Sequence, residues 1–150
     1  MQIIDVPTPA LILDRRVLTR NCVAMAERMQ HHNVRLRPHL KTAKSAEVAA
    51  LATAGQFGGI TVSTLAEARY FVEHGYRDIT YAVGIVPSKL DEVAEIQRSG
   101  ARITLLTDNL DAVSAAADRA ARSSTEFHLL IEIDTGGGRA GLPAESSELI

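Results

Sequence analysis

The chain has 150 residues, of which 46% are hydrophobic and 23% charged, and its formal net charge is −2. This length allows one domain with a packed core, and so small a net charge gives no field that would attract nucleic acid or an anionic membrane. The single cysteine, Cys22, excludes an internal disulfide framework, and no apolar run approaches the roughly 18 residues that a membrane span needs. We therefore expect a cytoplasmic protein with neither nucleic acid nor a membrane as partner.

Apolar runs rich in β-branched residues alternate with helical periodicity along the chain. Strands are predicted at residues 8–14, 34–41, 59–63, 78–83, 102–107 and 126–134. The helix after the first strand is predicted to bury an apolar stripe formed by Leu18, Cys22, Met25 and Met29. Later helices are predicted to begin at the capping residues Ser45, Thr64, Ser88 and Asp108, and residues 146–150 would begin another.

Strands that alternate with helices pair in parallel through right-handed crossovers. Two architectures fit this order: a doubly wound open sheet, and part of an eight-stranded α/β barrel. The last predicted helix, capped by Asp108, would turn Leu110, Val113 and Ala117 inward.

The predicted strand at residues 34–41 departs from the continuous apolar pattern of a covered parallel strand. Because side chains alternate along a strand, one face carries only polar residues, namely Arg35, Arg37, His39 and Lys41. Burying unpaired cations costs several kcal/mol, so this face needs acids, an anionic ligand or solvent. The strand at residues 126–134 offers Glu132 and Asp134 as charge partners, which predicts a polar site at the carboxyl ends of the strands. An exposed edge strand is the alternative.

Lys41 has a specific chemical use in such a place. A lysine amine that is partly desolvated among other cations loses its proton more easily and becomes a nucleophile for carbonyl groups. The phosphate and the phenolate of pyridoxal phosphate (PLP) would supply the anions that this cluster lacks.

The segment RPHLKTAKS at residues 37–45 closely resembles the RPHxKxxK signature of the D-threonine aldolase and D-serine dehydratase family, PLP enzymes of the alanine racemase-like type III fold. Further stretches agree at residues 7–14, 62–68, 107–108 and 133–141, so that the resemblance spans nearly the whole chain. In one position the chain departs from the signature, because many members have a histidine where it has Ala43.

The resemblance implies a parallel (βα)8 barrel, of which about six strands are present in this chain. Residues 1–150 would then be the N-terminal part of a single PLP-binding barrel domain, and the remaining barrel strands and a C-terminal β domain would lie outside them. The resemblance also implies a homodimer and, in the aldolase and dehydratase branches, a divalent metal ion whose ligands lie outside this chain; no metal ligands are assigned within it.

The resemblance further assigns roles to single residues. Lys41 would form the Schiff base with PLP, and Arg139 would hydrogen-bond the phenolic oxygen of the cofactor. His39 and Arg37 would support the cofactor ring and the lysine, and Lys44 would be a supporting or surface residue. Tyr81 alternates with apolar strand residues, so it is expected either to pack in the core or to contact the cofactor.

The expected activity is that of a PLP-dependent lyase, either aldolase or dehydratase, or of a racemase, acting on D-amino or D-hydroxyamino acids. A non-catalytic PLP-binding barrel protein and an inactive truncated fragment are the alternatives. A third possibility is a phosphate-binding fragment that uses the glycine-rich loop at residues 135–141. An incomplete barrel leaves strand edges open, so the isolated chain is expected to associate or aggregate.

Overall fold

A four-stranded parallel sheet forms the centre of the computed structural model, which describes residues 3–149. Its strands are β1 (Ile60–Val62), β2 (Asp78–Gly84), β3 (Arg102–Thr107) and β4 (His128–Ile131), in that spatial order. A second, two-stranded sheet joins β5 (Ile133–Asp134) to β6 (Leu142–Pro143). The prediction of a parallel α/β fold is therefore confirmed.

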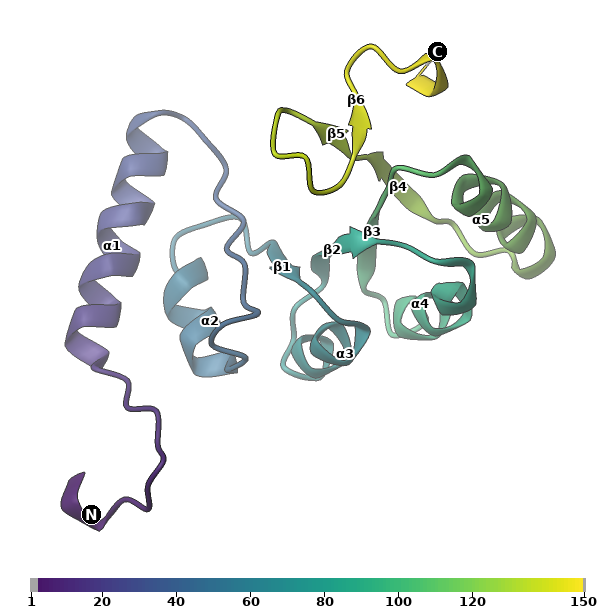
Figure 1. Ribbon diagram of the computed structural model, residues 1–150. Coiled ribbons are helices and arrows are strands. Elements are labelled where there is room, and N and C mark those ends of the chain that lie inside the picture. The colour runs from purple at the N-terminus through teal and green to yellow at the C-terminus, as the bar shows by residue number, and fades with distance from the viewer. Residues whose placement is uncertain (1–2, 150) are drawn as a thin grey trace.

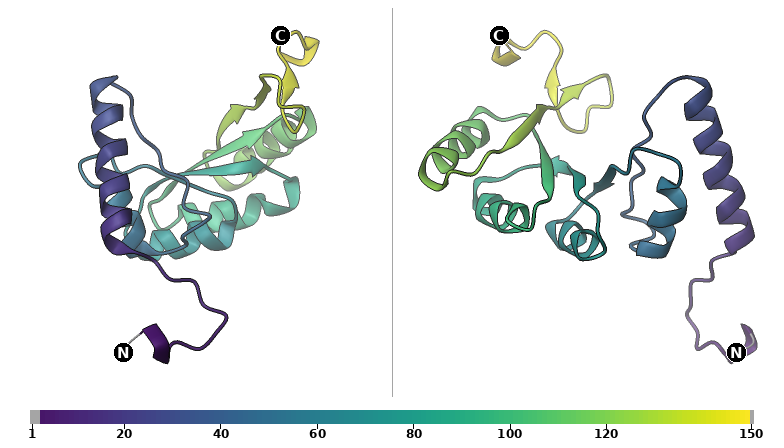
Figure 2. Two further views of the ribbon diagram at one scale, coloured as in Figure 1. Left: turned by 60° about the vertical axis from the view of Figure 1, so that its left-hand side comes forward. Right: turned by 180° about the vertical axis from the view of Figure 1, so that it is seen from behind.

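The helices form a row along one side of the main sheet, which curves like a section of a barrel wall, and the N-terminal helix continues this row past the edge of the sheet (Figures 1 and 2). They are α1 (Arg15–His31), α2 (Ala46–Thr53), α3 (Leu65–Glu73), α4 (Leu90–Gln97) and α5 (Leu110–Ser123). Short 3-10 turns occupy Ile3–Asp5, Pro87–Lys89 and Ser147–Leu149. Ile150, the last residue of the segment expected to begin a further helix, lies outside the described residues.

The core lies between the sheet and these helices. Neighbouring strands place apolar residues in register, so that Val62 lies beside Tyr81 and Tyr81 beside Leu105, and all three are fully buried. The alternate residues face the opposite side, where Thr61, Thr80 and Thr104 form a row. Side chains alternate along each strand, so the apolar residues lie on the face that the helices cover, and the threonines lie on the inner face of the sheet.

Two predicted strands are not strands in the structure. Residues 8–14 form no strand, and Leu11 is fully exposed. Residues 34–41 make only one isolated bridge, between His39 and Thr61. A strand needs continuous hydrogen bonding to a neighbour, and the prolines in both segments remove donors.

The strand predicted at residues 126–134 is divided at Glu132, because Glu132 donates to Thr107 and accepts from Leu142, which turns the chain from one sheet to the other. Two predicted caps are also wrong. Asn109, not Asp108, caps α5 by accepting from the N–H groups of Asp111 and Ala112. Ser88 lies within a 3-10 turn and makes no cap.

The predictions of which apolar residues each helix buries are correct for some helices and wrong for others. In α4, the predicted residues Leu90, Val93 and Ile96 are buried. In α5 the prediction is wrong, because Ala112 and Ala116 are the buried residues, whereas those expected to turn inward are exposed, namely Leu110, Val113 and Ala117. The stripe of α1 is only half-buried against α2, and Met25 is 46% exposed.

Across residues 3–149, no helix combines the length and the apolar character that crossing a bilayer requires.

Candidate functional site

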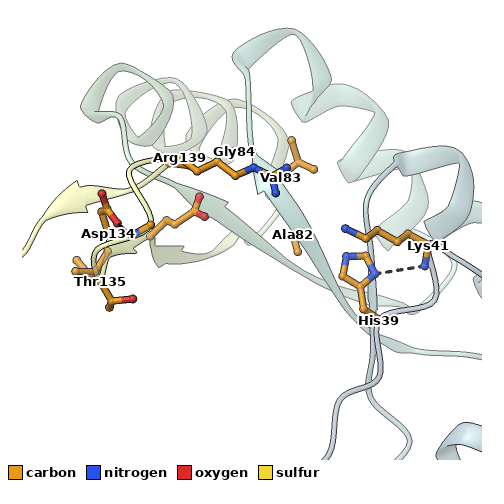
Figure 3. Close-up of a pocket in the computed structure, with 12 residues that line it drawn as sticks. His39, Lys41, Ala82, Val83, Gly84, Asp134, Thr135 and Arg139 are labelled. Carbon is orange, nitrogen blue, oxygen red and sulfur yellow. Dashed lines mark hydrogen bonds between the residues drawn. The ribbon is translucent and has the colours of Figure 1, made fainter.

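A pocket of about 440 Å³ opens at the carboxyl ends of the strands. Three segments form its walls: the chain around residues 39–41, the end of β2 at residues 82–84, and residues 132–140. Figure 3 shows Lys41 and His39 on one side of the pocket and Arg139 and Asp134 on the other. The polar site predicted at the strand ends is therefore present, and loops from different strands build it.

Lys41 enters the pocket just after the chain bonds to β1. The Leu40 N–H donates to the Thr61 carbonyl, and the Thr61 N–H donates to the Pro38 carbonyl, both at 2.9 Å. Pro38 lacks an N–H but still supplies this acceptor, which explains how a proline fits here. The backbone next to Lys41 is thus fixed, while the lysine side chain remains exposed at the mouth of the pocket.

His39 bridges the Lys41 backbone and the end of β1. Its Nδ1 accepts the Lys41 N–H at 3.3 Å, and its Nε2 lies 3.4 Å from the Ser63 hydroxyl. Because Nδ1 accepts, the neutral ring carries its proton on Nε2 and can donate to Ser63. Partial burial lowers the pKa of His39, the charge of Lys41 lowers it further, and the charge of Glu67 opposes both effects.

Glu67 ties the segment that carries Lys41 to the start of α3. Its carboxylate accepts the Ser63 N–H at 2.8 Å and pairs with Lys44 at 3.3 Å. Burial opposes the ionisation of Glu67, but the Ser63 N–H, the Lys44 ammonium and the Thr64 N–H together hold its pKa below the usual value. Thr64, which was predicted to cap this helix, accepts the Glu67 N–H at 3.0 Å, so that Thr64 and Glu67 together form a capping box.

Four N–H groups of the glycine-rich loop at residues 135–141 are bonded to carboxylates that flank or adjoin the loop. Asp134 Oδ1 accepts from three consecutive N–H groups at residues 136–138, at 2.8 to 3.2 Å. These bonds, from Gly136, Gly138 and Gly137 in order of effect, lower the pKa of Asp134. A loop whose amides already have acceptors does not offer them to a phosphate, which counts against the phosphate-binding alternative.

Two residues predicted for the site lie elsewhere. Arg37 binds at the opposite end of the sheet, where it pairs with Asp78 at 2.8 Å and donates to the Ile60 and Asp78 carbonyls. Tyr81 is fully buried in the core, and its hydroxyl accepts from Lys89 at 2.9 Å. The structure therefore brings together Lys41, His39 and Arg139, but not Arg37 or Tyr81.

The charge pairing predicted between the basic residues of the segment 34–41 and the acids Glu132 and Asp134 is also absent. Arg37 pairs with Asp78, and Asp134 accepts from the glycine loop. Sequence reasoning missed Ser63 as the partner of His39, and it assigned Asp108 to a helix cap although this residue accepts the Gly141 N–H at 3.0 Å. The position of Asp108 at the end of a strand was the available signal.

The fold and the pocket define a parallel α/β protein of the barrel type, with a lysine and an arginine facing one site at the strand ends. The profile of the family described as alanine racemase, N-terminal domain, matches residues 13–150. The chain belongs to this family, and the family resemblance identified from the sequence is confirmed.

The similar proteins include enzymes that are named as dehydratases and as aldolases. The D-threo-3-hydroxyaspartate dehydratase of Delftia sp. is 40% identical over 99% of this chain, and its structure gives a TM-score of 0.91 over 97% of the chain. The 3-hydroxy-D-aspartate aldolase of Paracoccus denitrificans is 30% identical over 95% of the chain. The structure of D-threonine aldolase from Filomicrobium marinum has a TM-score of 0.84 at 31% identity, over 93% of the chain.

The chain spans only part of these relatives. It covers 39% of the Delftia protein sequence, 38% of the Paracoccus one, and 38% of each of the two solved chains. The shared region therefore contains the barrel section described above, and the activity of a whole protein is a separate question.

Proposed function

We propose that this protein is a PLP-dependent lyase acting on D-amino or D-hydroxyamino acids, and that Lys41 holds the cofactor as a Schiff base. The observation that carries the proposal is that Lys41 and Arg139 line one pocket of about 440 Å³ at the strand ends. The dehydratase and aldolase names of the relatives favour a lyase over a racemase.

The residues of the pocket fit PLP. The cofactor needs an amine for its aldehyde and positive charge for its anionic oxygens, and the pocket offers Lys41 and Arg139. The volume lies within the range of roughly 300 to 1,000 Å³ that small-molecule sites occupy. When bound, PLP supplies the electron sink that weakens the bonds to the α-carbon of an amino acid.

Each side chain of the pocket would have a different role toward the cofactor. Lys41 would provide the amine that binds the aldehyde carbon. Arg139, which Figure 3 shows extending into the pocket from the loop, would donate to the phenolic oxygen. His39 would hold the Lys41 backbone and, with its lowered pKa, would add no positive charge next to the amine at neutral pH. Arg37 and Tyr81 would act through the fold instead.

We further propose that residues 1–150 are the N-terminal part of one PLP-binding barrel domain, which fits the 39% coverage of the Delftia relative. Under this proposal other segments supply the remaining strands, the groups that hold the phosphate and any metal ligands. A cytoplasmic location fits the single cysteine, and a homodimer is part of the same proposal.

Borohydride reduction tests the role of Lys41. The protein is mixed with PLP, reduced, digested and analysed by mass spectrometry. We expect an absorbance band of the Schiff base and a reduced tag on Lys41, and both should be lost in Lys41→Ala. Lys89→Ala is the matched control, because Lys89 bonds to Tyr81 in the core and does not line the pocket. A wild-type protein without a tag on Lys41 would overturn the proposal.

A second experiment separates a catalyst from a binding protein. The longest natural polypeptide that contains these residues is loaded with PLP and given D-threonine, D-serine or D-threo-3-hydroxyaspartate. An aldehyde product indicates an aldolase, and a keto acid with ammonia indicates a dehydratase. A Schiff base without any product would support the alternative of a non-catalytic PLP-binding protein.

A further inference from the structure

The glycine loop that carries Arg139 is held at both ends by carboxylates from different strands. At its start, Asp134 Oδ1 accepts from the N–H groups of residues 136–138 at 2.9, 2.8 and 3.2 Å, and Oδ2 accepts from the last of them at 3.1 Å. At its end, Asp108 Oδ2, just after β3, accepts the Gly141 N–H at 3.0 Å. Arg139 lies between these two attachments.

The end of the loop is also fixed by close backbone packing. Gly141 has a φ of +97°, and a Cβ at this position would come within 2.6 Å of the Asp134 nitrogen and 2.8 Å of the Ile133 carbonyl carbon. The chain then pairs with β5 as β6. With residues 136–138 bonded and Gly141 locked, the free length of the loop is reduced to Arg139 and Ala140.

We propose that Asp108 and Asp134 are positioning residues that hold the loop so that the Arg139 guanidinium reaches into the pocket. This inference rests on the proposed function for its chemical consequence, because the guanidinium would then meet the phenolic oxygen of PLP. Asp108 does not line the pocket, so any effect that it has there passes through the loop. Asp134 does line it, so its charge also acts directly.

Loss of the Arg139 position and loss of the Asp134 charge would shift the pH of Schiff-base deprotonation in opposite directions. A guanidinium near PLP disfavours a proton on the Schiff-base nitrogen, because both groups are positive. Freeing Arg139 from its position therefore raises the pH at which the Schiff base loses its proton. Removing only the negative charge of Asp134 lowers that pH. Asp134→Asn, which keeps the Oδ1 acceptor, and Asp134→Ala, which removes it, separate charge from position.

The main test uses Asp108. In the PLP-loaded protein, Asp108→Ala should shift the Schiff-base titration upward, in the same direction as Arg139→Gln, and weaken PLP binding by roughly tenfold, the effect of losing one charged hydrogen bond. Asp108→Asn keeps an acceptor oxygen for Gly141 and should restore both values. Asp111→Ala is the matched control, since Asp111 is an exposed neighbour on α5 that does not line the pocket.

A double variant distinguishes positioning from general destabilisation. If Asp108 acts through Arg139, Asp108→Ala combined with Arg139→Gln should titrate like Arg139→Gln alone. Additive shifts, or a lower melting temperature without any shift in titration, would overturn the proposal.

A readout that needs no cofactor keeps this inference separate from the proposed function. Trypsin cleavage after Arg139 should be several-fold faster in Asp108→Ala than in Asp108→Asn or Asp111→Ala, because the loop is freed at one end. Faster cleavage in a protein that forms no Schiff base would support the positioning of the loop by Asp108 and would contradict only the PLP assignment. Equal cleavage rates in all three variants would contradict this positioning role itself.

Discussion

His39 has a partner on each ring nitrogen, and this determines the charge beside Lys41. The Lys41 N–H occupies Nδ1, so only the neutral ring with its proton on Nε2 satisfies both contacts. A protonated ring would turn a donor toward the Lys41 N–H and add a second cation next to the lysine amine. The backbone of Lys41 therefore selects the form of the imidazole that leaves the amine with the least electrostatic competition.

A histidine titration tests this arrangement. The pKa of His39 should lie below the usual histidine value of 6.5, chiefly because of burial and secondarily because of Lys41, and Lys41→Met should raise it. Since the folded state binds this proton less tightly, the contribution to stability is complete above pH 6.5 and is lost as the pH falls through the lowered pKa. Proton NMR of the imidazole measures the midpoint. A midpoint at or above 6.5 would contradict the arrangement.

The sequence predicts the chemical role of a single residue better than it predicts which residues that residue contacts. Lys41 and His39 could be placed at the site from the alternation of polar residues at 34–41, and the family resemblance added Arg139. Arg37 has the same alternation as Lys41, but Lys41 follows it by four positions of extended chain, which carry the two residues to opposite ends of the sheet. Its true partner, Asp78, is distant in sequence, and alternation alone contains no information about such a pairing.

The capping box at the start of α3 links element formation to the site. Thr64 caps the helix, and Glu67 returns to Ser63 and to Lys44, which belongs to the turn after Lys41. Four residues thus stabilise a helix and fix the loop beside the pocket. This local pattern was predictable because the capping box depends on spacing along the chain and not on the tertiary fold.

Thr64→Ala tests the contribution of this cap. The substitution leaves the Glu67 N–H without its acceptor, so the free energy of unfolding should fall by about 1 kcal/mol. Thr64→Ser retains the hydroxyl and should lose much less. Urea denaturation followed by circular dichroism, at a concentration where the protein is monodisperse, measures both. Equal losses in the two variants would show that the methyl group, and not the hydrogen bond, stabilises this helix start.

Elements whose partners are near in sequence were predicted well, and the others were not. Strands β1, β2 and β3 lie within the predicted segments or extend them by one residue, and each contacts a helix that is next to it in the chain. Residues 8–14 and 34–41 have the composition of strands but lack a continuous ladder. A strand is defined by its neighbour, so an apolar run shows only where a strand could form.

On the scale of the whole molecule, apolar side chains remain exposed in the segment before α1 and on the edge strand β4. Leu11, Ile12 and Leu13 precede α1, and on the other side Leu130 and Ile131 of β4 are 52% and 55% exposed. β4 is also an edge of the main sheet, with backbone groups that a further strand could pair. Such surfaces are normally covered in a soluble protein.

We therefore expect the 150-residue chain to self-associate. Sedimentation velocity should show species larger than a monomer, increasing with protein concentration. Leu130→Lys should reduce association, because it places a charge on the exposed edge strand, whereas Ala117→Lys on the exposed side of α5 should not. A monodisperse wild-type monomer that melts cooperatively would contradict this expectation. It would mean that the curved sheet is stable with its inner face open to water, and that a complete barrel is not needed to hold Lys41 and Arg139 around one pocket.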